Sequence, residues 1–373
     1  MDGPIRYWES RSGTIFMNTI PIITQREYPQ QIFSPKSLKG KYCLTPFRTI
    51  AIDMKGDVGL CHCAGWMPQK IGNILENTLE DLLSNSIAQK VRQSITNGTF
   101  NYCNELTCGI IHSNKLVEIN KLSIDHQNLI NSPESYAIPD DIFLAMDTTC
   151  NLSCPSCRTS ITKLSEVQVD TQQKIGKILY SNLFSTPSDR SMSLRLSSSG
   201  EVFASPLLLN FLQQINSQNF PNIKLWIQTN GLLAQSRWHH VQHLEKHIKN
   251  ITITFDASSA ATYEKLRRGG KWKDLLAALT FLKIKKESLG FELQTRMVVQ
   301  LDNFQEISDF YELSKQFGAD IIDYARITDW GTYEPGEFAN IDVFNSLHPL
   351  YNHARKKLET VLSFPDVISS GGL

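Results

Sequence analysis

Short apolar runs alternate with longer amphipathic stretches through the middle and C-terminal parts of the chain. The intervening stretches place apolar residues at helical spacing, as in 271–279 and 306–313. The apolar runs have the length and composition of buried strands, and each ends in polar or glycine-containing residues. They lie at about residues 142–148, 192–198, 223–229, 250–256, 292–300 and 319–326. Repeated strand and helix units predict a parallel sheet covered by helices.

The six strand and helix units are fewer than a closed eight-unit barrel requires. We therefore expect an α/β fold built on an open, partial (β/α)6 barrel. In parallel α/β architectures, functional groups collect at the carboxyl ends of the strands. The residues that follow each apolar run are thus the first candidates for chemistry.

The first third of the chain has a different pattern and predicts a small α+β domain. Residues 49–60 read as a β-hairpin around a Lys-Gly-Asp turn, and residues 76–96 read as a helix that ends at Asn97-Gly98. Residues 113–141 carry no strong strand pattern, which is typical of a linker. We divide the chain into an N-terminal extension (1–40), the α+β domain (41–112), a linker (113–138), the partial barrel (139–345) and a C-terminal helix and tail (346–373).

Composition removes several classes of partner. The chain has 373 residues, with 37 basic and 37 acidic side chains, so it lacks the basic excess of a broad nucleic-acid surface. It begins with Met1-Asp2-Gly3-Pro4 rather than a basic and apolar signal, and no apolar run approaches the ~18 residues of a membrane span. We expect a cytoplasmic protein that binds neither nucleic acid nor membrane.

The eight cysteines form two groups. A disulfide scaffold would need a higher density, and clustered thiols in a reducing compartment bind metal or carry redox chemistry. The second group has the spacing C-x-x-x-C-x-x-C directly after the strand predicted at 142–148. Its members are Cys150, Cys154 and Cys157, and the first group holds Cys43, Cys61, Cys63, Cys103 and Cys108. Three thiolates on one loop can hold a four-iron cluster whose fourth iron stays open. A structural zinc site or inert thiols are the alternatives.

The central motif resembles the signature of the radical S-adenosylmethionine (SAM) enzymes. The resemblance implies that Cys150, Cys154 and Cys157 hold a catalytic [4Fe-4S] cluster. It further implies that SAM binds the open iron and is cleaved reductively to a 5′-deoxyadenosyl radical, which abstracts a substrate hydrogen atom. An electron donor such as flavodoxin or ferredoxin is implied as a partner.

The same resemblance assigns SAM contacts to residues at the ends of the later strands. Ser199, Gly200 and Glu201 are similar to the family's Gly-Gly-Glu loop, and Arg267 is a candidate partner for the SAM carboxylate. Each of these positions also reads as an ordinary turn or an exposed helix side chain. The remaining candidates are Thr229, Asn230, Asp256, Arg296 and Val298.

The first cysteine group resembles the SPASM/twitch domain, which holds an auxiliary cluster and follows the barrel in most relatives. Here it precedes the barrel. We expect one auxiliary [4Fe-4S] cluster, with Cys63 able to replace Cys61 as a ligand. The expected ligands are Cys43, Cys61, Cys103 and Cys108. Tetrahedral coordination of zinc by four cysteines is the alternative.

The resemblance favours an enzyme that modifies a ribosomally made precursor peptide by a crosslink or an epimerisation. A radical epimerase needs a hydrogen-atom donor, and Cys63 is the spare cysteine that would fill this catalytic role. An enzyme acting on a sugar, nucleoside or other small metabolite is the alternative within the class. A non-catalytic zinc-binding interaction protein is the alternative from another class.

Overall fold

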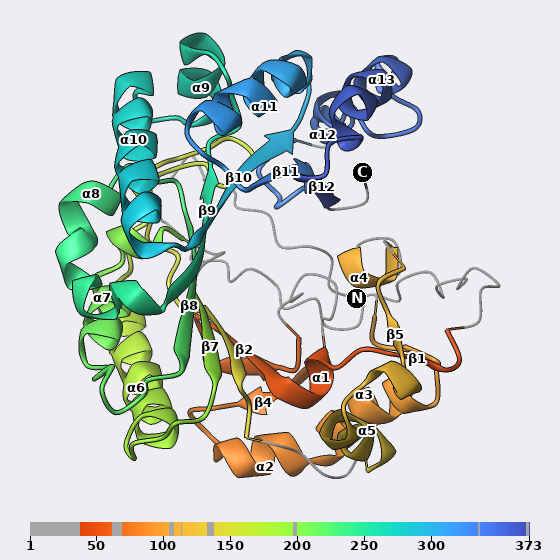
Figure 1. The fold of residues 1–373 in the computed structure, drawn as a ribbon, viewed down its shortest axis with the longest axis vertical. Helices are drawn as coiled ribbons and strands as arrows, with labels where there is room; N and C mark the ends of the chain where they lie inside the picture. Colours follow the sequence, from red (N-terminus) through yellow and green to blue (C-terminus); the bar gives the residue numbers. More distant parts are fainter. Residues whose placement is uncertain are drawn as a thin grey trace, which may run out of the picture.

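The computed structural model describes residues 38–61, 69–103, 108–112, 114–132, 138–196, 200–334, 336–370 and 373. Among them, ten strands form one curved sheet in the order β12-β11-β10-β9-β8-β7-β6-β2-β3-β4. The strands from β12 to β2 run parallel; β3 pairs antiparallel with β2, and β4 pairs antiparallel with β3. Figure 1 shows the sheet curving, with the helices from α6 to α11 on its outer side. The predicted α/β fold with an open, partial barrel is confirmed.

The bounds of the strands and helices are as follows. The strands are β1 Lys41–Tyr42, β2 Thr49–Asp53, β3 Asp57–Gly59, β4 Lys70–Asn73, β5 Val117–Glu118, β6 Asp141–Ala145, β7 Met192–Leu196, β8 Ile223–Thr229, β9 Ile248–Thr254, β10 Glu292–Val299, β11 Ile321–Arg326 and β12 Val367–Ser370. The α-helices are α1 Thr45–Arg48, α2 Leu79–Ser84, α3 Ser86–Thr96, α4 Gly109–His112, α5 Ile124–Asn131, α6 Glu166–Leu183, α7 Pro206–Gln213, α8 Ala234–Arg237, α9 Ala260–Leu266, α10 Trp272–Leu289, α11 Ile307–Gln316, α12 Glu337–Ile341 and α13 Tyr351–Leu362. The short 3-10 helices are η1 Ile119–Lys121, η2 Val202–Ala204, η3 Trp238–His240, η4 Gln242–His247 and η5 Phe304–Glu306.

Alternation along the strands explains why the sheet is covered on its outer side. Every second residue of β7, β8 and β10 is buried. These residues join one large core with the apolar faces of the outer helices, for example Leu194 with Ile175 and Leu179 of α6. The other residues of these strands are half-buried and largely polar. Period-two alternation thus separates an apolar outer face from a polar concave face.

A second, smaller core belongs to the N-terminal third. It is formed by apolar residues from α1, α3, α4 and α5 and the segments between them. Its buried members are Phe47, Ile95, Phe100, Ile111, Leu116 and Ile130. This core supports the segments that carry three cysteines of the first group, because Cys43, Cys103 and Cys108 pack against it.

The helix predicted over 76–96 is two helices, α2 and α3, separated at Asn85. The Asn85 side-chain oxygen accepts hydrogen bonds from the backbone N–H groups of Ile87 (3.0 Å) and Ala88 (2.9 Å). Its side-chain amide donates to the carbonyl of Ile71 at 2.6 Å. Asparagine at an N-cap begins a new helix by satisfying its first free N–H groups. The apolar spacing continues across this break, so periodicity alone did not reveal it.

The segment predicted as a linker, 113–138, contains β5, η1 and α5. β5 pairs with β1, and Ile130 of α5 is buried in the smaller core. The sheet is also continuous across the expected boundary near residue 138, because β2 pairs in parallel with β6. The boundary therefore separates two parts of the sequence but not two sheets. β12, which lies in the predicted C-terminal tail, adds a further parallel strand beside β11.

Candidate functional site

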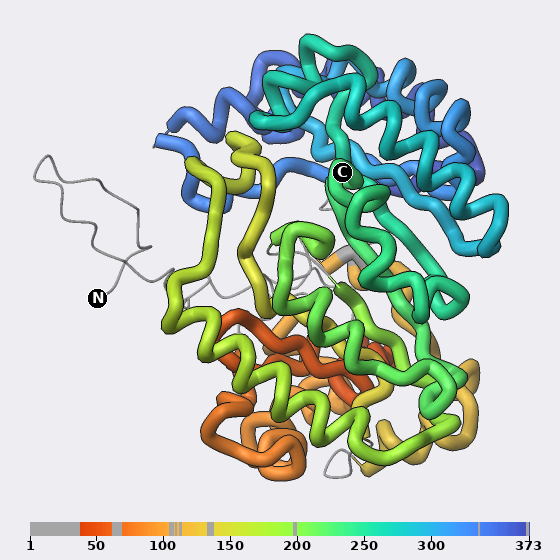
Figure 2. The backbone as a smooth tube through the Cα atoms, turned by 90° about the vertical axis from the view of Figure 1, so that its left-hand side faces the viewer, coloured from red at the N-terminus to blue at the C-terminus, as the bar shows by residue number. Residues whose placement is uncertain are grey.

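The three central cysteines lie on the loop that follows β6, at the carboxyl end of that strand. Within the loop, the N–H of Cys157 donates to the carbonyl of Cys154 at 2.9 Å. The N–H of Ser153 donates to the carbonyl of Arg268, just after α9, at 3.0 Å. Figure 2 shows the segment after β6, in yellow, reaching toward the C-terminal half of the chain. The loop thus carries the cysteines from the first barrel strand to the helix that follows the fourth.

Each of the three thiols has a side-chain nitrogen donor within reach. The donors come from three separate places: the residue after the third cysteine, the end of β8, and the end of α9. The pairs are Arg158 Nη2 with Cys157 Sγ at 3.4 Å, Arg267 Nη1 with Cys154 Sγ at 3.7 Å, and Asn230 Nδ2 with Cys150 Sγ at 4.0 Å. Two of the three donors are guanidinium groups and carry a positive charge.

The chemistry of these donors fits an iron–sulfur cluster. Burial raises the pKa of the Cys150 and Cys154 thiols, which acts against the thiolate form. Cluster binding requires thiolates, so it must supply the free energy of deprotonation, and adjacent N–H donors lower that cost. Three cysteines on one loop with three such donors have the ligand type and the surroundings that a cluster needs.

Glu201 joins the ends of β7 and β8. Its side chain is buried, and Oε1 accepts from the hydroxyl of Thr229 while Oε2 accepts from the N–H of Asn230, both at 2.6 Å. Oε1 also accepts from the N–H of Phe203 at 3.1 Å. Burial raises the pKa of Glu201 despite these hydrogen bonds. The carboxylate thus positions Asn230, which in turn reaches Cys150.

Gly200 lies against the backbone that leads into the cysteine loop. A Cβ at this position would lie 2.5 Å from the carbonyl oxygen of Asp147 and 2.6 Å from that of Thr149. Only glycine permits so close an approach of two backbones. The N–H of Glu201 also donates to the Thr149 carbonyl at 2.8 Å. The segment after β7 is therefore hydrogen-bonded to the segment after β6.

Asp256, just after the end of β9, holds a second group of contacts beside the cysteine loop. It is buried with φ +61°, and its carboxylate accepts from the N–H of Val298 at 2.7 Å and pairs with Arg267 Nη2 at 2.8 Å. The Asn303 side-chain amide donates to the Asp256 carbonyl at 2.9 Å. A non-glycine residue with positive φ is uncommon and is held here by surrounding hydrogen bonds. Asp256 thereby places Arg267 beside Cys154.

The structure therefore places some of the predicted SAM-contact residues beside the cysteine loop and others away from it. Two groups adjoin the cysteine loop, one around Glu201 and one around Asp256. Arg296 instead pairs with the buried Asp323 on the neighbouring strand, with Nε 2.6 Å from Oδ2. Ser199, and also Cys63, lie outside the described residues. Sequence reasoning missed Arg158, although its place directly after Cys157 was a usable signal.

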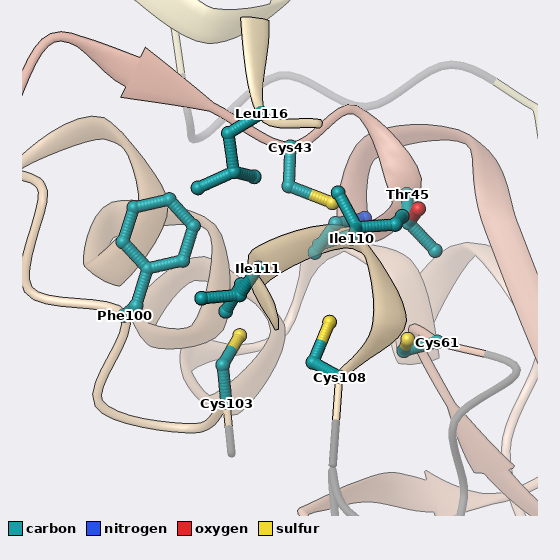
Figure 3. A pocket seen from close by; sticks show the side chains of 10 residues that line it. Cys43, Thr45, Cys61, Phe100, Cys103, Cys108, Ile110, Ile111 and Leu116 are labelled. Atoms are coloured by element: carbon teal, nitrogen blue, oxygen red, sulfur yellow. The ribbon is translucent and has the colours of Figure 1, made fainter. Parts of the chain in front are cut away.

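Four cysteines of the first group line one pocket. Cys43 precedes α1, Cys61 follows β3, Cys103 follows α3 and Cys108 precedes α4. Figure 3 shows the four cysteine side chains around this pocket, with apolar side chains on one side of it. The other lining residues are Thr45, Pro46, Phe100, Ile110, Ile111 and Leu116. Four thiols from four separate segments, in an apolar setting, are the ligand type of either a cluster or a tetrahedral zinc ion.

A buried arginine is hydrogen-bonded to a residue that lines this pocket. Arg92 of α3 is almost fully buried, and its Nε donates to the carbonyl of Pro46 at 3.2 Å. Its Nη1 donates to the carbonyl of Leu83 at 2.8 Å. Burial also raises the pKa of the thiol of Cys43, which lies just before α1.

A family model matches the part of the chain that carries the first cysteine group. Residues 43–109 match the SPASM family model, described as an iron–sulfur cluster-binding domain. The predicted SPASM-type domain is thereby confirmed. A comparison with curated proteins found no match.

Several solved structures are similar at low identity. Streptococcus suis SuiB bound to its precursor peptide SuiA is 12% identical, with a TM-score of 0.41, covering 76% of this chain and 62% of that one. A radical SAM methyltransferase from Sphaerobacter thermophilus is 12% identical, with a TM-score of 0.35, covering 59% and 63%. The anSMEcpe structure with bound AdoMet and a peptide is 17% identical, with a TM-score of 0.35, covering 49% of each chain. The chain thus spans less than two thirds of the length of these structures.

Residues 43–109 thus match an iron–sulfur cluster-binding domain, and an open parallel barrel follows them in the sequence. The three-cysteine loop lies after the first strand of this barrel, and the SPASM match covers the other cysteine group. None of the helices that the structure describes is long and apolar enough to cross a membrane.

Proposed function

We propose that the chain is a radical SAM enzyme that modifies a ribosomally made peptide by a crosslink or an epimerisation. The observation that carries the proposal is the coexistence of two separate cysteine sites, one on the loop after β6 and one in the SPASM-type domain. When bound, the cluster and SAM together supply a 5′-deoxyadenosyl radical that abstracts a hydrogen atom.

In this proposal the two sites have different tasks. Cys150, Cys154 and Cys157 hold the cluster that SAM binds, at the carboxyl end of the first barrel strand. The four cysteines of the pocket in Figure 3 hold the auxiliary cluster, which accepts an electron from the substrate or shapes its pocket. The polar concave face of β7 to β10 is the surface against which a substrate would be oriented.

The strand-end groups would position SAM in the mouth of the barrel. Glu201 and Asp256 each commit their carboxylate oxygens to protein donors. They would therefore act on SAM through the backbone and side chains that they hold, Asn230 and Val298 among them. Contacts of Thr229, Gly200 and Arg296 with SAM remain part of the proposal.

The deciding experiment uses anaerobically reconstituted and reduced protein. The protein is incubated with SAM and candidate precursor peptides, and 5′-deoxyadenosine and a change in peptide mass are measured together. Both are expected with wild type, and both are lost in a Cys150→Ala variant. Formation of 5′-deoxyadenosine with a small metabolite but with no peptide would move the substrate to another class. Two zinc ions with no sulfide would remove the enzyme proposal.

A further inference from the structure

Two arginine side chains flank the central cysteine loop, and each is fixed by a second contact. Arg158 Nη2 lies 3.4 Å from Cys157 Sγ, and Arg158 Nη1 donates to the carbonyl of Thr148 at 2.8 Å. Arg267 Nη1 lies 3.7 Å from Cys154 Sγ. Each guanidinium is therefore held near a sulfur atom by the protein itself.

The anchor of Arg267 is rigid. Its Nη2 lies 2.8 Å from Oδ2 of Asp256, whose other carboxylate oxygen accepts the N–H of Val298 at 2.7 Å. Asp256 is only 2% exposed, so its carboxylate needs a charged partner at this place. Arg267 is consequently committed to a position between Asp256 and Cys154.

A positive donor beside a ligand sulfur changes how readily a cluster accepts an electron. Reduction adds one negative charge to a site that already holds three thiolates. N–H donors and cations near the sulfur atoms stabilise the reduced form more than the oxidised form, and hydrogen bonds to sulfur are an established control of reduction potential. Two guanidinium groups on two of three ligands would therefore make reduction easier.

We propose that Arg158 and Arg267 are positioning residues that raise the reduction potential of the cluster held by Cys150, Cys154 and Cys157. The inference rests on the proposed function, because it requires that cluster. It assigns Arg267 a role other than the SAM-carboxylate contact that the resemblance implies. The Nε of Arg267 is buried and has no hydrogen-bond partner among the described residues. The experiment must distinguish two acceptors for this N–H group, a sulfide of the cluster and the carboxylate of SAM.

The experiment is an EPR-monitored redox titration of the reconstituted protein, with and without SAM. The variants are Arg267→Gln, Arg158→Gln and the double variant Asp256→Asn/Arg267→Gln, which removes both charges of the buried pair. Arg158→Lys retains the charge, and Arg268→Gln, an exposed neighbour, is the matched control. In the absence of SAM, each glutamine variant is expected to shift the midpoint potential to a more negative value. Arg158→Lys is expected to shift it less, and Arg268→Gln not at all.

Specific outcomes overturn the inference. If the SAM-free potentials of Arg158→Gln and the double variant equal that of wild type, the arginines do not control reduction. If Arg267→Gln only weakens SAM binding, Arg267 is a SAM ligand, as the sequence resemblance implies. Should Arg267→Gln fail to fold, Arg158→Gln and the double variant still decide the question. Wild type that takes up no cluster overturns the proposed function as well, whereas unchanged potentials in a SAM-cleaving protein overturn this inference alone.

Discussion

The carboxylate of Glu201 accepts a hydrogen bond from the hydroxyl of Thr229 at 2.6 Å, which ties the loop after β7 to the last residue of β8. The same carboxylate accepts the N–H groups of Asn230 and Phe203. All three partners are donors, and all are buried. A carboxylate, which accepts at both oxygens, therefore suits this position.

Glu201→Gln is expected to destabilise the cluster-free protein by about 1–3 kcal/mol, because its amide group would face a donor and leave a buried group unsatisfied. Chemical denaturation followed by circular dichroism measures this loss. Thr229→Val is the graded comparison, with an expected loss of about 1 kcal/mol for one hydroxyl partner. Equal stability of Glu201→Gln and wild type would show that the carboxylate has no structural role.

Gly200→Ala is expected to cost about 1–3 kcal/mol, because the added methyl group meets two carbonyl oxygens that belong to the backbone. Gly176→Ala is the control, since Gly176 lies in α6 and its Cβ would meet no atom closer than 3.9 Å. Alanine in a helix interior is favoured over glycine by up to about 1 kcal/mol. Thermal unfolding should therefore move in opposite directions for the two variants. A Gly200→Ala protein as stable as wild type would mean that the cysteine loop shifts freely.

The barrel strands were predictable because each carries its own local signal. The six predicted strands coincide with β6 to β11 within a few residues, since long alternating or continuous apolar runs leave few other conformations. β12 was not predicted, because its four residues, Val-Ile-Ser-Ser, give too short a pattern. The pairing of Ile50 with Ile142 joins residues far apart in sequence, and local periodicity carries no information about such a pair.

The candidate site was predictable in its residue types but not in its connections. The spacing of the central cysteines and the family resemblance of the first group indicated the two sites, and the structure places Cys43, Cys61, Cys103 and Cys108 around one pocket. That Asp256 holds Arg267 depends on how β9 and α9 meet in space, which a single sequence does not encode in any short motif. The roles of the cysteines as cluster ligands and of the strand-end residues as SAM contacts stay predictions.

Glu306 is expected to give the protein an acid-sensitive element away from the cysteines. Burial acts to raise the pKa of Glu306, but hydrogen bonds from Thr262, the Ser258 backbone and Ser259 outweigh it, so the net pKa lies below its usual range. Its oxygens accept from the Ser258 N–H at 2.6 Å and the Ser259 hydroxyl at 2.7 Å. These residues lead into α9, the helix that ends at Arg267.

A depressed pKa in the folded state contributes stability above the unfolded value, about 4.3 for glutamate, and this contribution is lost as the pH falls through the folded pKa. Glu306→Gln is therefore expected to lose about 1 kcal/mol at pH 7, because hydrogen bonds to a charged, partly exposed acceptor are replaced by weaker ones. The difference from wild type should shrink as the pH falls below about 4. Urea denaturation at several pH values measures it. A difference that stays constant with pH would assign the effect to packing instead.

Metal analysis of cysteine variants tests the division into two sites. Wild type is expected to bind about eight irons and eight sulfides per chain, as two four-iron clusters. A Cys108→Ala variant should retain about four irons and the EPR signal that responds to SAM, because the loop after β6 is untouched. A Cys154→Ala variant should also retain about four irons but lose that response. Cys63→Ala is the matched control within the SPASM-type domain, and it should keep both clusters if Cys61 is the ligand. Zinc without sulfide in the Cys154→Ala protein would instead make the pocket beside α1 and α4 a structural zinc site.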